Sequence, residues 1–180
     1  MFWLSTDHRL LTTEIMIELK KLGKEAIPAA IEKARQYRLL NEPSAAESIC
    51  LDILAADPDN QEALVIIVLA MTDRLTRDYS VGDSQISTYL AKISDEFQRT
   101  YYTGIVYERR AKALLNKNAA GSEATIFELF SQAMNWFERA ENLSSNQNDN
   151  ALLRWNACAR IVNSNRLAPG EKSHDFDFLE

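Results

Sequence analysis

Apolar residues recur along most of the chain at intervals of three and four, the spacing that places them on one face of a helix. The first such run is Leu11, Ile15, Leu19 and Leu22, and Gly23 follows it as a helix-ending glycine would. No stretch alternates apolar and polar residues for long enough to make a strand. The pattern therefore predicts an all-α protein with about eight helices, over residues 11–22, 26–40, 43–56, 60–76, 83–93, 95–116, 122–143 and 148–164.

Proline and glycine fall where these helices should begin or end. Pro28 and Pro43 each open an alanine-rich periodic segment, where the missing N–H of proline costs nothing. The sequence Asp57-Pro58-Asp59-Asn60 predicts a turn between two apolar helices. Residues 165–180 contain Pro169-Gly170 and then a polar, acidic and aromatic end, so we predict a flexible acidic C-terminal tail there.

Small residues also repeat at a longer spacing. Twelve positions separate Ala34 from Ala46, and another twelve separate Ala46 from Pro58. Within this segment, the run AAESICLDILAADPDNQEAL contains the end of one helix pair, a closing turn and the start of the next pair. The arrangement resembles the tetratricopeptide repeat (TPR), a family in which two helices pack through small residues where they cross.

A second match to this repeat lies downstream. Gly104 and Tyr107 keep the glycine-to-tyrosine spacing of the first repeat helix. Ala133, Phe137 and Ala140 keep the small–aromatic–small spacing of the second helix, after longer helices than usual.

The resemblance covers about residues 26–162 as three units, of which the middle one, over residues 60–93, is degenerate. It implies a right-handed superhelix of stacked antiparallel helix pairs, because one pair cannot bury its own apolar stripe and stacked pairs share a core. We therefore expect three parts: an N-terminal capping helix within residues 1–25, a helical repeat domain over 26–164, and the tail over 165–180.

The resemblance also implies that the first helix of each pair lines a concave groove. Positions three before, and one and four after, the small residue at the crossing share one face of a helix. Counting from Ala34, Val68 and Gly104 gives a candidate peptide-binding groove of Ile31, Arg35, Arg38, Val65, Leu69, Thr72, Tyr101, Ile105 and Glu108, with Arg109 beside them. An apolar stripe with charges at its edges suits an extended or helical peptide.

Composition and charge exclude several other classes of function. The 180 residues carry a net charge of −6, which argues against a dedicated nucleic-acid binder, because phosphate affinity comes mostly from clustered Lys and Arg. The longest apolar stretch, Ala63–Met71, is shorter than the ~20 residues needed to cross a bilayer. Charged residues follow Met1–Leu4 at once, so no secretory signal is predicted. We expect a soluble, cytoplasmic protein without membrane insertion.

Residues suited to catalysis or metal binding are sparse. The two histidines, His8 and His174, lie near the N-terminus and in the predicted tail, where no scaffold orients a nucleophile. Cys50 and Cys158 fall in apolar helical runs without metal-ligand neighbours, which predicts small buried thiols. No Gly-rich phosphate loop or zinc motif occurs in the sequence. We therefore predict a protein that is not an enzyme and has no metal and no cofactor.

These observations lead to a non-enzymatic protein–protein interaction module, a TPR-like adaptor, scaffold or chaperone that binds a peptide segment of a partner protein. The alternative is a structural subunit that forms a homo-oligomer through its end helices. A further hypothesis concerns residues 174–180, which alternate acidic and large apolar side chains. This tail either docks on the groove arginines Arg35, Arg38 and Arg109 or remains a solvated chain.

Overall fold

The computed structural model describes residues 17–75, 83–118, 120–144 and 149–170, and within these ranges the chain forms helices and their connections without any strand. The elements are η1 (a 3₁₀-helix, Lys24–Ala26), α1 (Ile27–Leu39), α2 (Pro43–Ala56), α3 (Gln61–Arg74), α4 (Asp83–Ala91), α5 (Glu96–Lys117), α6 (Glu123–Leu143) and α7 (Asn150–Ser164). The all-α prediction is thus confirmed for the described residues. The seven helices predicted after residue 25 each begin and end within two residues of an observed helix.

The predicted helix over residues 11–22 is not observed where the structure describes it. Residues 17–23 form no helix, so the prediction is wrong for that part, while residues 11–16 lie outside the described ranges. Ile17 and Leu19 are 85% and 82% exposed, and Leu22 alone packs against a core. The physical reason is that a short helix is unstable in water unless a packed apolar face supports it. The capping role predicted for residues 1–25 remains a prediction.

The first residues of the predicted C-terminal tail, 165–170, lie within the described ranges. The backbone N–H of Leu167 donates to the carbonyl of Val162, and the Leu167 side chain packs against the core of the last three helices. Residues 165–167 are therefore held by hydrogen bonding and packing at the end of α7. The remainder of the predicted tail, residues 171–180, lies outside the described ranges.

Local capping explains why two of the helices begin where they do. The side chain of Asn60 accepts a hydrogen bond from the backbone N–H of Ala63 at 3.0 Å, at the start of α3. Asp95 caps α5 in the same way, accepting from the N–H of Gln98 at 2.6 Å. Each cap satisfies a backbone donor that has no partner within the first turn of a helix.

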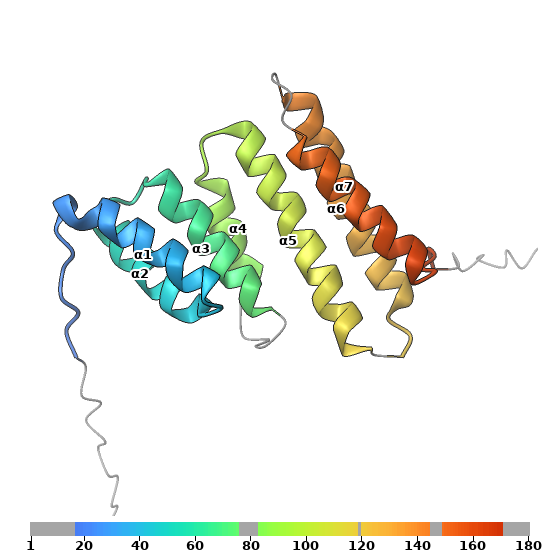
Figure 1. The fold of residues 1–180 in the computed structure, drawn as a ribbon, viewed down its shortest axis with the longest axis horizontal. Helices are drawn as coiled ribbons and strands as arrows, with labels where there is room; N and C mark the ends of the chain where they lie inside the picture. Colours follow the sequence, from blue (N-terminus) through green and yellow to red (C-terminus); the bar gives the residue numbers. More distant parts are fainter. Residues whose placement is uncertain (1–16, 76–82, 119, 145–148, 171–180) are drawn as a thin grey trace, which may run out of the picture.

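The helices lie side by side in a row that runs from α1 to α7 (Figure 1). Short connections reverse the chain within α1–α2 and α5–α6, so each of these hairpins is antiparallel. In addition to these neighbours, α1 contacts α3 and α3 contacts α5. The odd-numbered helices α1, α3 and α5 therefore share one surface of the row.

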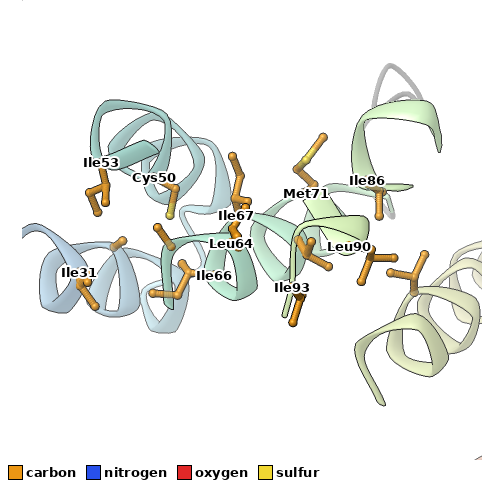
Figure 2. Close-up of a cluster of buried hydrophobic side chains, with 14 of the residues drawn as sticks. Ile31, Cys50, Ile53, Leu64, Ile66, Ile67, Met71, Ile86, Leu90 and Ile93 are labelled. Carbon is orange, nitrogen blue, oxygen red and sulfur yellow. The ribbon is translucent and has the colours of Figure 1, made fainter. Parts of the chain in front are cut away.

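The buried apolar side chains form two clusters. The first lies mainly among α1 to α4, and Figure 2 shows ten of its members: Ile31, Cys50, Ile53, Leu64, Ile66, Ile67, Met71, Ile86, Leu90 and Ile93. The second lies among α5, α6 and α7, around Phe130 and Phe137. Tyr102 packs against both clusters, so the α3–α5 contact is where the two cores meet.

The small residues predicted at helix crossings are buried at close contacts. Ala34 and Ala46 are fully buried in α1 and α2, and Ala133 is fully buried in α6. A Cβ atom added to Gly104 of α5 would lie 2.7 Å from a ring carbon of Phe137 of α6. The close approach of these two helices therefore requires a residue without a side chain at position 104.

Candidate functional site

A hollow of about 580 Å³ lies among α1, α3 and α5, on the surface shared by the odd-numbered helices. We call it the α1–α3–α5 hollow, and its lining residues are Arg35, Arg38, Leu39, Gln61, Glu62, Val65, Ile66, Leu69, Gln98 and Tyr102. Four residues of the predicted groove, namely Arg35, Arg38, Val65 and Leu69, are among them. The predicted groove and the observed hollow therefore share these four residues of α1 and α3.

The wall of the hollow combines apolar side chains with charged and amide side chains. Three apolar residues are partly exposed along it: Val65 and Leu69, which lie one turn apart on α3, and Tyr102 of α5. Leu39, at the last position of α1, is 88% exposed, an unusually complete exposure for a leucine at the edge of an apolar surface. Gln61 is held in place, since its side-chain oxygen accepts from the backbone N–H of Ser94 at 2.8 Å.

The first arginine of the hollow is paired with two carboxylates. Arg35 donates to Glu32 of the same helix and to Glu62 of α3, at 2.5 Å in each case, and its side chain is 48% exposed. Exposed ion pairs of this kind stabilise a protein by only about 0–1 kcal/mol, so a ligand can exchange for either partner. With two carboxylates around one guanidinium, this edge of the hollow is formally negative by one charge.

A second set of charged residues joins the three helices around the hollow. Asp73 of α3 accepts from Arg38 of α1 at 2.8 Å and pairs with Arg109 of α5 at 2.7 Å. Arg109 also donates to the carbonyl of Leu69 at 2.8 Å and to the hydroxyl of Thr72 at 2.5 Å. Burial lowers the pKa of Arg109, and the carboxylate of Asp73 opposes that effect. These contacts give the arginines a structural role, because their donors already have partners within the fold.

Glu108 lies deeper than the sequence predicts. It is 1% exposed, and it pairs with Lys112 one turn along α5 and with Arg154 of α7 at 3.3 Å. Burial lowers the pKa of Arg154, but the Glu108 carboxylate and Tyr101 together raise that pKa above its ordinary value. The second carboxylate oxygen of Glu108 has no hydrogen-bond partner among the described residues. Glu108 therefore joins α5 to α7 and does not face the hollow.

The other predicted groove residues are also inside the protein or away from the hollow. Ile31, Thr72 and Ile105 are 7%, 2% and 2% exposed, so they are buried in the core and do not line the hollow. Tyr101 is half-buried, with its ring 5.8 Å from that of Phe137. The reason is that the positions beside a helix crossing lie between two surfaces, and some of them face the neighbouring helix in place of the groove.

The sequence reasoning missed six residues of the hollow: Leu39, Gln61, Glu62, Ile66, Gln98 and Tyr102. For three of them, the sequence contains a pattern that indicates their position on the same helix face. Gln61 lies one turn before Val65, and Gln98 lies one turn before Tyr102, so extending the stripe one turn toward the helix N-termini would have found both. Tyr102 differs from the predicted Tyr101 by a shift of one position in the third unit.

Two features of other functional classes, a metal-binding cluster and a membrane-spanning helix, are absent from the described residues. No group of three or more His, Cys, Asp or Glu side chains there could hold a metal ion. His8 and His174 lie outside the described ranges, as does the predicted tail segment 174–180. The helices of the described ranges include none that is long and apolar enough to cross a membrane.

Comparison with known proteins identifies no matching protein family, curated protein or solved structure. The resemblance to the tetratricopeptide repeat therefore rests on the chain's own residues, chiefly Ala34, Ala46, Pro58 and Gly104.

Proposed function

We propose that the protein is a non-enzymatic interaction module, a TPR-like adaptor, scaffold or chaperone whose helix pairs stack into a right-handed superhelix. In this proposal the α1–α3–α5 hollow binds a peptide segment of a partner protein. The observation that carries the proposal is the hollow itself, a cavity of about 580 Å³ open between three helices, in which apolar and polar side chains lie together and Leu39 is exposed at the edge. Concave, mostly apolar surfaces with a few polar groups are where ligands bind most often.

The pairing of the arginines indicates what kind of peptide the hollow would take. Arg35 is paired with Glu32 and Glu62, and Arg38 is paired with Asp73, so the formal charges around the hollow nearly cancel. The larger part of the affinity would then come from burying apolar side chains, at roughly 25 cal/mol per Å² of apolar area removed from water.

An amphipathic helix or extended peptide with one or two large apolar side chains is the ligand that this surface favours. A strongly acidic peptide is favoured less, since it would have to displace Glu62 or Asp73 from their arginines. This reduces the electrostatic basis of the hypothesis that residues 174–180 dock on Arg35, Arg38 and Arg109.

The proposal is tested by selecting peptides from a random display library against the protein and measuring the affinity of those enriched by isothermal titration calorimetry. We expect the selected peptides to bind the Leu39→Ser variant about tenfold more weakly, because part of the apolar contact area is lost. The matched control is Leu51→Ser on α2, which is also exposed but does not line the hollow. Failure to enrich any peptide, or equal affinity for the two variants, would contradict the proposal.

A further inference from the structure

Large apolar side chains are exposed at both ends of the row of helices. At one end, Ile17 and Leu19 precede α1 and are 85% and 82% exposed. At the other end, Leu152 and Leu153 of α7 are 40% and 60% exposed. Figure 1 places residues 17–23 and α7 at opposite ends of the long axis, so one molecule cannot bring its own two surfaces together.

The surface at the α7 end is hollowed and acidic. A hollow of about 280 Å³ lies between α6 and α7, and we call it the α6–α7 hollow. Leu152 and Trp155 supply its apolar wall, and the exposed carboxylates of Glu138 and Glu141 lie at its edge beside Asn156. Neither carboxylate forms an ion pair with another residue in the described part of the chain.

The surface at the α1 end is complementary in charge. Residues 17–24 contain Lys20, Lys21 and Lys24 and one acidic residue, Glu18, which gives this segment a net charge of +2 (three positive, one negative). All four charged side chains are exposed. Residues 17–23 are not helical, and the carbonyl of Gly23 accepts from the N–H of Ala26 at 3.0 Å.

We infer that residues 17–24 of one molecule dock in the α6–α7 hollow of a second copy, with Ile17 and Leu19 against Leu152 and Trp155 and the lysines facing Glu138 and Glu141. The contact joins two different surfaces, so it is heterologous, and repeating it builds an open head-to-tail chain of molecules. The inference does not depend on peptide binding in the α1–α3–α5 hollow, whose lining residues belong to neither docking surface.

The affinity expected from this contact is low. The α6–α7 hollow is small, and ion pairs at an exposed edge contribute little individually and weaken in salt. Self-association should therefore depend on protein concentration, decrease as salt is added, and continue beyond a dimer.

Sedimentation velocity of the full chain over a wide concentration range, at low and high salt, tests the inference. We expect the wild type to grow beyond a dimer at high concentration, and the reversals Lys20→Glu/Lys21→Glu and Glu138→Lys/Glu141→Lys each to weaken association roughly tenfold or more. A chain that carries all four reversals restores complementary charges and should associate again. The matched controls are Lys92→Glu and Glu128→Lys, which reverse exposed charges outside both surfaces and should behave as wild type.

Several outcomes would overturn the inference. A wild type that stays monomeric at every concentration would show that residues 17–24 do not bind the α6–α7 hollow of a second copy. Association that survives both single-surface reversals, or that the four-residue reversal does not restore, means that other surfaces are responsible. A dimer that never grows further indicates a symmetric contact in place of a head-to-tail one. Circular dichroism of every variant separates these results from loss of the fold.

Discussion

Arg109 of α5 pairs with Asp73 of α3 at 2.7 Å, across the contact where the two apolar cores meet. The other carboxylate oxygen of Asp73 accepts from Arg38 of α1 at 2.8 Å. One side chain therefore connects the three helices that line the α1–α3–α5 hollow. Together with the packing of Tyr102, Val106 and Leu69 between the two cores, this carboxylate holds α5 against α1 and α3.

Removing that carboxylate should destabilise the protein measurably. In Asp73→Ala, two guanidinium groups remain near each other, each about three-quarters buried and without the carboxylate. Loss of one partner from a fully buried ion pair costs about 3–5 kcal/mol, and the partial exposure here reduces the expectation to about 1–3 kcal/mol. Urea unfolding followed by circular dichroism measures the change. Asp52→Ala, at an exposed position of α2, is the control, and an equal effect of the two variants would exclude the role given to Asp73.

The contact between α5 and α6 should not tolerate a side chain at position 104. Gly104→Ala places a methyl group 2.7 Å from the ring of Phe137, and overpacking in a core typically costs about 1–3 kcal/mol. The helix propensity of alanine offsets up to about 1 kcal/mol of that cost. We expect a net decrease in the free energy of unfolding. In Gly104→Ala/Phe137→Leu the two changes should cost less together than the sum of their separate effects, whereas strict additivity would mean that they do not touch.

The two cysteines should be inert in the folded protein. Burial raises the pKa of Cys50 and of Cys158 from 9.0 to about 12, so neither is a thiolate at neutral or mildly alkaline pH. A thiol reagent added at pH 8 should label them only as fast as the protein unfolds. Rapid labelling of the native protein at that pH would contradict their burial.

The same shift predicts how stability depends on pH. The folded state holds the thiol protons up to about pH 12, and the unfolded state releases them near pH 9.0, so protons favour the folded state between these values. The contribution of the two thiols to stability is complete below pH 9.0 and is lost as the pH rises toward 12. Urea unfolding at pH 8 and pH 10 should show a smaller loss of stability in Cys50→Ala/Cys158→Ala than in wild type.

Most helix bounds could be predicted because local residues determine them. Pro43 opens α2, and the side chains of Asn60 and Asp95 cap α3 and α5, so sequence alone locates these ends. The helix predicted over residues 11–22 is not formed in its described part, residues 17–22, because Ile17 and Leu19 are exposed and cover no apolar surface there. Apolar spacing indicates that a helix is possible, and only tertiary packing decides whether it forms.

The candidate site was predicted less completely than the fold, for a geometric reason. Val65 and Leu69 follow from the face of one helix, and the structure places both in the hollow. Which of Tyr101 and Tyr102 reaches the hollow depends on the rotation of α5 about its axis, and one position changes that rotation by about 100°. The pairing of Asp73 with both Arg38 and Arg109 depends on how three helices slide along one another, which no single-helix pattern contains.

The central claim, that the α1–α3–α5 hollow is a peptide-binding site, is tested most directly by NMR chemical-shift mapping. The measurement titrates a selected peptide into the isotope-labelled full chain and follows backbone amides and methyl groups. We expect the largest chemical-shift changes at Leu39, Val65, Leu69 and Tyr102, with little change at Leu51 on α2. Largest shifts on the outer faces of α2 or α6, with the hollow unchanged, would contradict it.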